Sequence, residues 1–206
     1  MRILPEGKRI TVHGMEEHEG FGFDDFAIEM EEFEVRKVRK HDRMWQVEEG
    51  GSIVQIPLYH DGVVYFGSMN RIFYAVDAKT GEKLWQYRTE GILLESSPCF
   101  HEGRVYFGSY DRNMYCIEAA TGKLVWKFET QGRINAAPHI SGGKVYFGCE
   151  DQHMYCLEAY TGSLIWKFKT WDEVHTNPIV HDGKLFFGST AQYLILKAPC
   201  PVLSVK

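Results

Sequence analysis

Short strand-like segments follow one another along most of this chain, with glycine-containing turns between them. The segment 124–129 (LVWKFE) alternates, with its aromatic residues on one face and its charged residues on the other, which predicts a strand exposed on one side. The segment 104–108 (RVYFG) is apolar on both faces, as expected for a strand between two neighbours. Glycine ends the connections 101–103 and 120–122, where a tight turn needs a positive φ. The pattern predicts an all-β protein.

The same markers return at a nearly constant interval. Four tryptophans are separated by 40, 41 and 40 residues: Trp45, Trp85, Trp126 and Trp166. A glycine closes VVYFG, RVYFG, KVYFG and KLFFG in the same register: Gly67, Gly108, Gly148 and Gly188. Within one unit we expect four strands, at 96–100, 104–109, 113–119 and 124–130. A four-stranded unit of about 40 residues is one propeller blade, which must stack on its neighbours to bury both faces. The predicted fold is a β-propeller.

Three complete blades are expected, at 53–89, 94–130 and 134–170. A fourth is split between a leading strand at 44–48 and trailing strands from 177 onward. Three arrangements fit this count: a self-closed four-bladed ring, a homodimer that exchanges strands in an eight-bladed ring, or a piece of a longer propeller. We divide the chain into a charged extension of uncertain fold (1–43), propeller repeats (44–198) and a tail (199–206).

One motif within the repeat carries a family resemblance. Ala75-x-Asp77-x-x-Thr80-Gly81-x-x-x-Trp85 resembles the tryptophan-docking motif of the PQQ-like (quinoprotein-type) propeller repeat. It returns at 116–126 and 156–166 with cysteine for alanine and glutamate for aspartate, and the resemblance covers about residues 44–190. It implies structural roles for Trp45, Trp85, Trp126, Trp166, Gly81, Gly122 and Gly162. Each tryptophan is expected to pack on the next blade and to donate its indole N–H to a backbone acceptor.

Composition and charge narrow the function classes. The net charge of −5 argues against a nucleic-acid partner. No apolar run approaches the length that spans a membrane, and the first 20 residues lack the apolar core of a secretory signal. We therefore expect a cytoplasmic chain as the sequence stands, and leave the compartment open for the case in which the chain is a fragment.

Quinone chemistry is the activity that the resemblance invites. In the dehydrogenases of this family, a vicinal cysteine disulfide, a calcium site and a catalytic aspartate surround the cofactor. The five cysteines here include no adjacent pair: Cys99, Cys116, Cys149, Cys156 and Cys200. Cys116 and Cys156 occupy the small-residue position of the repeat, which suits buried structural thiols. We expect no metal and no cofactor; PQQ with calcium belongs to the alternative function only.

The remaining candidate site is the face formed by the loops that join the strands at one end of each blade. Loops on a rigid scaffold are where binding residues concentrate. We predict binding residues, and no catalytic ones, in these loops: Arg71, Glu95, Asp111, Arg112, Arg133, Asn135, Glu173, His175 and Asn177. The favoured function is a non-catalytic scaffold for a protein or peptide partner. The alternatives are a PQQ-dependent oxidoreductase, or a fragment of one, and a ligand-sensing domain.

Overall fold

The computed structural model describes residues 51–189 and 192–197, with side chains described as far as Gly188. The predicted extension (1–43), the leading strand with Trp45 and the tail (199–206) lie outside these residues, so the domain boundaries stay predictions. Within the described ranges the regular elements are strands, and no helix there is long and apolar enough to cross a bilayer.

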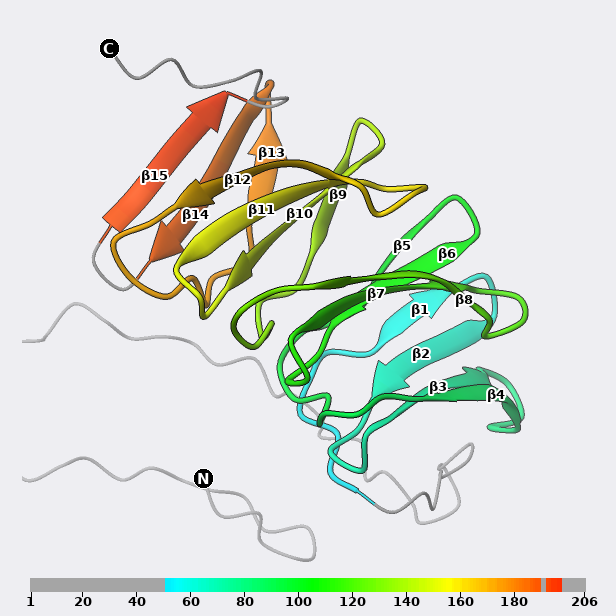
Figure 1. The fold of residues 1–206 in the computed structure, drawn as a ribbon. Helices are drawn as coiled ribbons and strands as arrows, with labels where there is room; N and C mark the ends of the chain where they lie inside the picture. Colours follow the sequence, from blue (N-terminus) through cyan, green and yellow to red (C-terminus); the bar gives the residue numbers. More distant parts are fainter. Residues whose placement is uncertain (1–50, 190–191, 198–206) are drawn as a thin grey trace, which may run out of the picture. The chain divides into compact units, whose positions relative to one another are not determined.

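The described strands form four antiparallel sheets, one after another along the chain (Figure 1). The first blade is β1 (Leu58–His60), β2 (Val63–Gly67), β3 (Ile72–Asp77) and β4 (Lys83–Arg88). The second is β5 (Cys99–His101), β6 (Arg104–Gly108), β7 (Asn113–Glu118) and β8 (Leu124–Glu129). The third is β9 (His139–Ser141), β10 (Lys144–Cys149), β11 (His153–Glu158) and β12 (Leu164–Lys169). The fourth has β13 (Ile179–His181), β14 (Lys184–Ser189) and β15 (Gln192–Lys197). The three complete blades are confirmed, whereas the leading strand of the split fourth blade lies outside the described residues.

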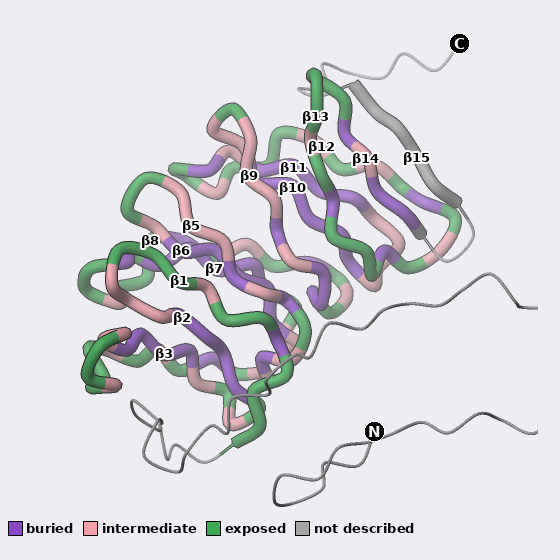
Figure 2. The backbone as a smooth tube through the Cα atoms, turned by 180° about the vertical axis from the view of Figure 1, so that it is seen from behind, coloured by how far each residue is buried: buried purple, intermediate pink, exposed green. Residues whose placement is uncertain are grey.

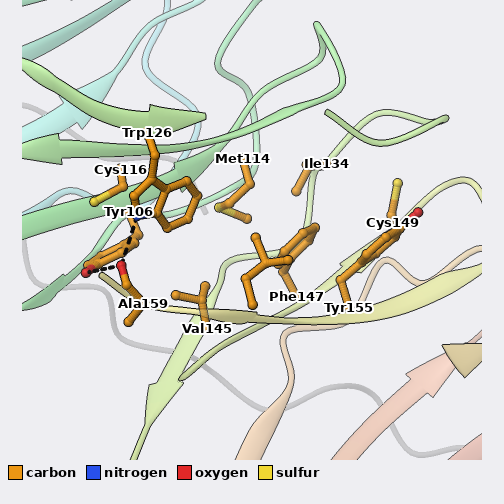
Figure 3. Close-up of a cluster of buried hydrophobic side chains, with 11 residues drawn as sticks. Tyr106, Met114, Cys116, Trp126, Ile134, Val145, Phe147, Cys149, Tyr155 and Ala159 are labelled. Atoms are coloured by element: carbon orange, nitrogen blue, oxygen red, sulfur yellow. Dashed lines mark hydrogen bonds between the residues drawn. The ribbon is translucent and has the colours of Figure 1, made fainter. Parts of the chain in front are cut away.

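Burial follows the expected order of strands within a blade. The two middle strands of each complete blade are almost wholly buried, whereas the fourth strand alternates between exposed and covered positions (Figure 2). Middle strands are apolar on both faces because a neighbouring blade covers each face. The main clusters therefore lie between blades, and the one in Figure 3 joins Tyr106 and Cys116 of the second blade to Val145 and Phe147 of the third.

Tryptophan docking occurs as the motif predicts at Trp85 and Trp126, whereas Trp166 Nε1 is buried without a hydrogen-bond partner among the described residues, because no fourth-blade turn is described beside it. Trp126 is only 8% exposed and donates its indole N–H to the carbonyl of Ala159 in the next blade (2.9 Å; Figure 3). Its ring lies so close to Gly162 that a Cβ there would sit 2.6 Å from Cδ2. Gly162 also has a positive φ of 73°, so backbone and space both require glycine. Trp85 repeats the arrangement on Ala119, with a 2.8 Å bond.

Successive blades meet through their first strands, but the ends of the row do not meet. Strands β1 and β5, β5 and β9, and β9 and β13 approach within 8 Å between Cα atoms, whereas no such approach joins β1 to β13. The described residues therefore form an open row of blades. The self-closed four-bladed ring is not the arrangement that this structure adopts.

Candidate binding site

The loops between blades are held against the ends of the second strands. The N–H of Ile134 donates to the carbonyl of Ser109 (3.2 Å), and Val174 donates to Cys149 in the same way (3.2 Å). A Cβ on Gly108 would meet the Ile134 side chain at 2.3 Å, which explains why the YFG segment ends in glycine. These contacts fix the loop backbone, so the polar side chains on it have defined positions.

Asp111 and the equivalent Asp151 hold the loop backbone rather than facing outward. Asp111 Oδ2 accepts hydrogen bonds from the N–H groups of Glu90 and Gly91, both at 3.0 Å. Asp151 Oδ2 accepts one from the N–H of Gln131 at 3.0 Å. Tyr115 and Tyr155, each four residues after its aspartate, donate their hydroxyl groups to the same Oδ2 atoms, at 2.9 Å and 2.7 Å. The geometry gives Asp111 an architectural role beside any role in binding.

Three more of the predicted residues lie apart from a common site. Asn177 Oδ1 accepts the N–H of Ala137 (2.7 Å) and so links two blades. Arg112 pairs with Glu129 of its own blade at 2.9 Å. Arg71 is exposed and, like Arg112, occupies a turn position with positive φ.

Of the other five predicted residues, Asn135, His175 and Glu173 are joined by hydrogen bonds, whereas Arg133 and Glu95 lie around Tyr110. At the centre is Asn135, which is only 6% exposed. Its Nδ2 donates to Glu150 Oε1 (3.3 Å) and to His175 Nδ1 (2.7 Å). On the far side of the imidazole, His175 Nε2 lies 2.8 Å from Glu173 Oε2. One buried amide therefore sets the positions of a carboxylate and an imidazole that come from different loops.

These contacts also fix the protons of the cluster. Because Asn135 Nδ2 is a donor, His175 Nδ1 acts as the acceptor, and the ring carries its proton on Nε2 for Glu173. Glu150 favours this amide orientation, since the reverse would set Asn135 Oδ1 against a carboxylate. Asn135 Oδ1 is buried without a hydrogen-bond partner among the described residues. Most buried polar atoms in native structures are hydrogen-bonded, so this acceptor is an exception.

Arg133 and Tyr110 extend the cluster toward the second blade. The Arg133 guanidinium lies 5.1 Å from the centroid of the Tyr110 ring. The pKa of Tyr110 is raised, mainly by burial and then by the carboxylates of Glu95 and Glu150, while Arg133 opposes them. Together with Glu173 this makes three glutamates, Glu95, Glu150 and Glu173, around the guanidinium of Arg133. Carboxylates therefore outnumber the guanidinium among these residues.

Sequence reasoning missed three residues of this region: Tyr110, Glu150 and Trp171. Trp171 is 79% exposed and lies in the same loop as Glu173 and His175. The chain has five tryptophans and only four follow the repeat, so the out-of-register Trp171 was the available signal. We call this set the loop cluster: Glu95, Tyr110, Arg133, Asn135, Glu150, Trp171, Glu173 and His175.

The calcium that accompanies the quinone would be held by oxygen ligands, among them carboxylates. Within residues 51–189 and 192–197, no three His, Cys, Asp or Glu side chains are grouped so that they could hold a metal ion. Cys116 and Cys156, the two cysteines predicted to be structural, are both buried, and Cys149 is buried as well.

Comparison with known proteins agrees with the fold. The family model described as outer membrane protein assembly factor BamB matches residues 41–98 and 90–195. BamB from Moraxella catarrhalis has a similar structure, with a TM-score of 0.68 and 21% identity over 76% of this chain and 50% of that one. The chain thus spans half the length of this relative.

Two other solved structures share the fold. The computationally designed Ika4 protein has a TM-score of 0.66 and 18% identity, over 74% of this chain and 95% of that one. Quinohemoprotein alcohol dehydrogenase ADHIIG from Pseudomonas putida HK5 has a TM-score of 0.62 and 18% identity, over 70% and 29%. The same fold therefore occurs in an assembly factor, in a designed protein and in an alcohol dehydrogenase.

Proposed function

The chain belongs to the family of outer membrane protein assembly factor BamB, with PQQ-like propeller repeats, and from this premise we propose that it is a non-catalytic scaffold that binds a protein or peptide partner. The partner contacts the loop cluster. The observation that carries the proposal is the buried Asn135, which positions Glu150 and His175 from two different loops, the second of which also carries the exposed Trp171.

The chemistry of the loop cluster suits a peptide ligand with both apolar and basic groups. A large exposed aromatic ring on a fixed loop is the usual anchor of a binding hot spot. Beside it, Glu173 and Glu150 offer carboxylate oxygens, which form strong hydrogen bonds with lysine or arginine. The loops are tied to the sheets by backbone bonds, so little ordering entropy is lost on binding.

We propose further that binding requires no quinone. The support is that the described residues bring no calcium ligands together. Addition of PQQ with calcium is expected to leave the melting temperature unchanged, because a ligand raises it only by binding the folded state. A concentration-dependent increase would favour the oxidoreductase alternative instead.

The test of the proposed function is selection from a random peptide library against the immobilised protein, followed by calorimetric measurement of affinity. We expect enriched peptides that contain basic and apolar residues. Trp171→Ala and Glu173→Gln should each weaken binding about tenfold or more, the usual effect of losing a hot-spot contact.

Asp182→Asn is the matched control. Asp182 is a strongly exposed acidic residue in the turn between β13 and β14, and its positive φ of 48° is one that asparagine tolerates. This variant removes the same charge away from the loop cluster and should bind like the wild type. The proposal fails if no peptide is enriched, or if the enriched peptides bind the loop-cluster variants and the wild type equally.

A further inference from the structure

The ring of His175 is held at both of its nitrogen atoms, and only one protonation state fits these contacts. Nε2 carries the proton that faces Glu173 Oε2 at 2.8 Å, and Nδ1 accepts from Asn135 Nδ2 at 2.7 Å. A second proton, on Nδ1, would set two N–H groups against each other across that distance. The contacts of the loop cluster therefore belong to the neutral imidazole.

Asn135 cannot relieve this conflict and keep its contact with Glu150. A half-turn of the amide would present Oδ1 to the charged ring, and Oδ1 gives up no hydrogen bond, since it has none among the described residues. The same half-turn would set Oδ1 against the Glu150 carboxylate, which now accepts from Nδ2 at 3.3 Å. If the ring moves away instead, it leaves its place beside Asn135. In both cases protonation of His175 takes apart the arrangement that positions the imidazole and the carboxylate together.

The charged groups around His175 come from three segments of the chain. Its own loop carries Asp172 and Glu173, and the turn between β10 and β11 contributes Glu150. The loop before β9 contributes Arg133, whose guanidinium lies over a tyrosine ring. The side chains of His175 and Glu173 are 44% and 47% exposed, so a proton from solvent and a cation of a partner both reach them. The proton and the cation therefore compete for the same carboxylates.

We propose that His175 is a proton switch on the loop cluster: its neutral ring leaves Glu173 and Glu150 free to bind a lysine or arginine side chain, and its charged ring takes the place of that side chain. This inference rests on the proposed function, because it concerns the same surface. A bound cation disfavours the proton by the same factor by which the proton disfavours the cation. Histidine side chains change charge between about pH 5 and 8. The affinity for a cation should therefore rise with pH through this range and reach its full value where the ring is neutral.

The experiment measures the affinity of the dipeptide Phe-Arg with both ends blocked, so that the guanidinium is its only charge. Titrations followed by the indole NMR signal of Trp171 are run at about pH 7.5 and about pH 5.5. The dissociation constant should be about fivefold or more higher at the lower pH, as is usual for two coupled sites. The same dipeptide with uncharged citrulline in place of arginine should bind without this pH dependence.

His175→Asn separates the switch from the titration of the carboxylates. Asparagine can place its oxygen where Nδ1 accepts from Asn135, but it carries no titrating group. Its dissociation constant for Phe-Arg should be the same at the two pH values. His181→Asn is the matched control, since His181 ends β13 and its side chain is 76% exposed beside Asp182, away from the loop cluster. This variant should keep the pH dependence of the wild type.

A measurement on the protein alone tests the switch without any ligand. The side-chain amide signals of Asn135 should shift together with the titration of the His175 ring. Amide signals that stay unchanged while the ring titrates would overturn the proposal. So would equal pH dependence in the wild type and His175→Asn, or a Phe-Arg probe that binds at neither pH. A peptide library that yields no enriched sequence would count against the proposed function instead, because the coupling of Asn135 to His175 is observed without a partner.

Discussion

At the scale of single residues, two tryptophans of this chain have opposite environments. Trp126 is buried between blades and hydrogen-bonded to Ala159, whereas Trp171 is largely exposed on a loop. Trp126→Ala should lower the free energy of unfolding by about 3–5 kcal/mol, the usual cost of truncating a buried aromatic residue. Urea unfolding monitored by circular dichroism measures it.

Trp171→Ala is the matched control, since it removes the same atoms from an exposed position. It should change the free energy of unfolding by less than about 0.5 kcal/mol, as is usual for exposed substitutions. If Trp126→Ala costs under about 1 kcal/mol, docking does not stabilise the blades and the interpretation of the repeated motif is wrong.

The buried thiols of two cysteines predict how the free energy of unfolding depends on pH. Burial raises the pKa of Cys116 and of Cys149 from 9.0 to about 12. Above about pH 9 the unfolded chain loses these protons while the folded chain keeps them. The folded state then binds more protons, so the free energy of unfolding should be at its full value below pH 9 and should fall as the pH rises toward 12.

Urea midpoints at about pH 8 and about pH 10.5 test this linkage. Cys116→Ala is the control, because alanine occupies the same repeat position in the first blade at Ala75. That variant should lose less stability between the two pH values than the wild type does. Equal losses in the two proteins would contradict a contribution from this thiol.

At the scale of elements, the third and fourth strands of the second and third blades are joined by a turn against which the tryptophan of the preceding blade packs. Gly162 and Gly103 both have positive φ, at 73° and 75°, but only Gly162 faces a tryptophan; nothing lies within 4 Å of a Cβ at Gly103. Gly103→Ala should therefore cost only the backbone strain of about 1–2 kcal/mol. Gly162→Ala should cost clearly more, because it also displaces Trp126.

Thermal melts of the two glycine variants give the difference directly. Since the backbone cost is shared, the excess in Gly162→Ala reports the contact between blades. Similar melting temperatures for the two variants would show that the Trp126 indole adapts to the added methyl group without loss of stability.

At the scale of the whole molecule, the repeat explains why the sheets could be predicted and the loop cluster only in part. Strand positions follow from alternation and from the interval between tryptophans, which are local properties of the sequence. Which polar side chains meet depends on how neighbouring blades pack. The predicted binding residues Asp111 and Asn177 hydrogen-bond to backbone groups, whereas Glu150, which was not predicted, reaches Asn135. Neither kind of contact can be predicted from neighbouring residues in the sequence, because the partners are 15 to 40 residues apart.

The central claim is that partners bind at the loop cluster, and hydrogen exchange with a selected peptide tests it most directly. Amides of 109–112, 131–135, 149–152 and 171–177 should exchange more slowly when the peptide is bound, because these loops form the proposed contact surface. The turns at 61–62, 102–103 and 182–183 should be unaffected. Protection confined to those turns or to the outer strands would contradict the account.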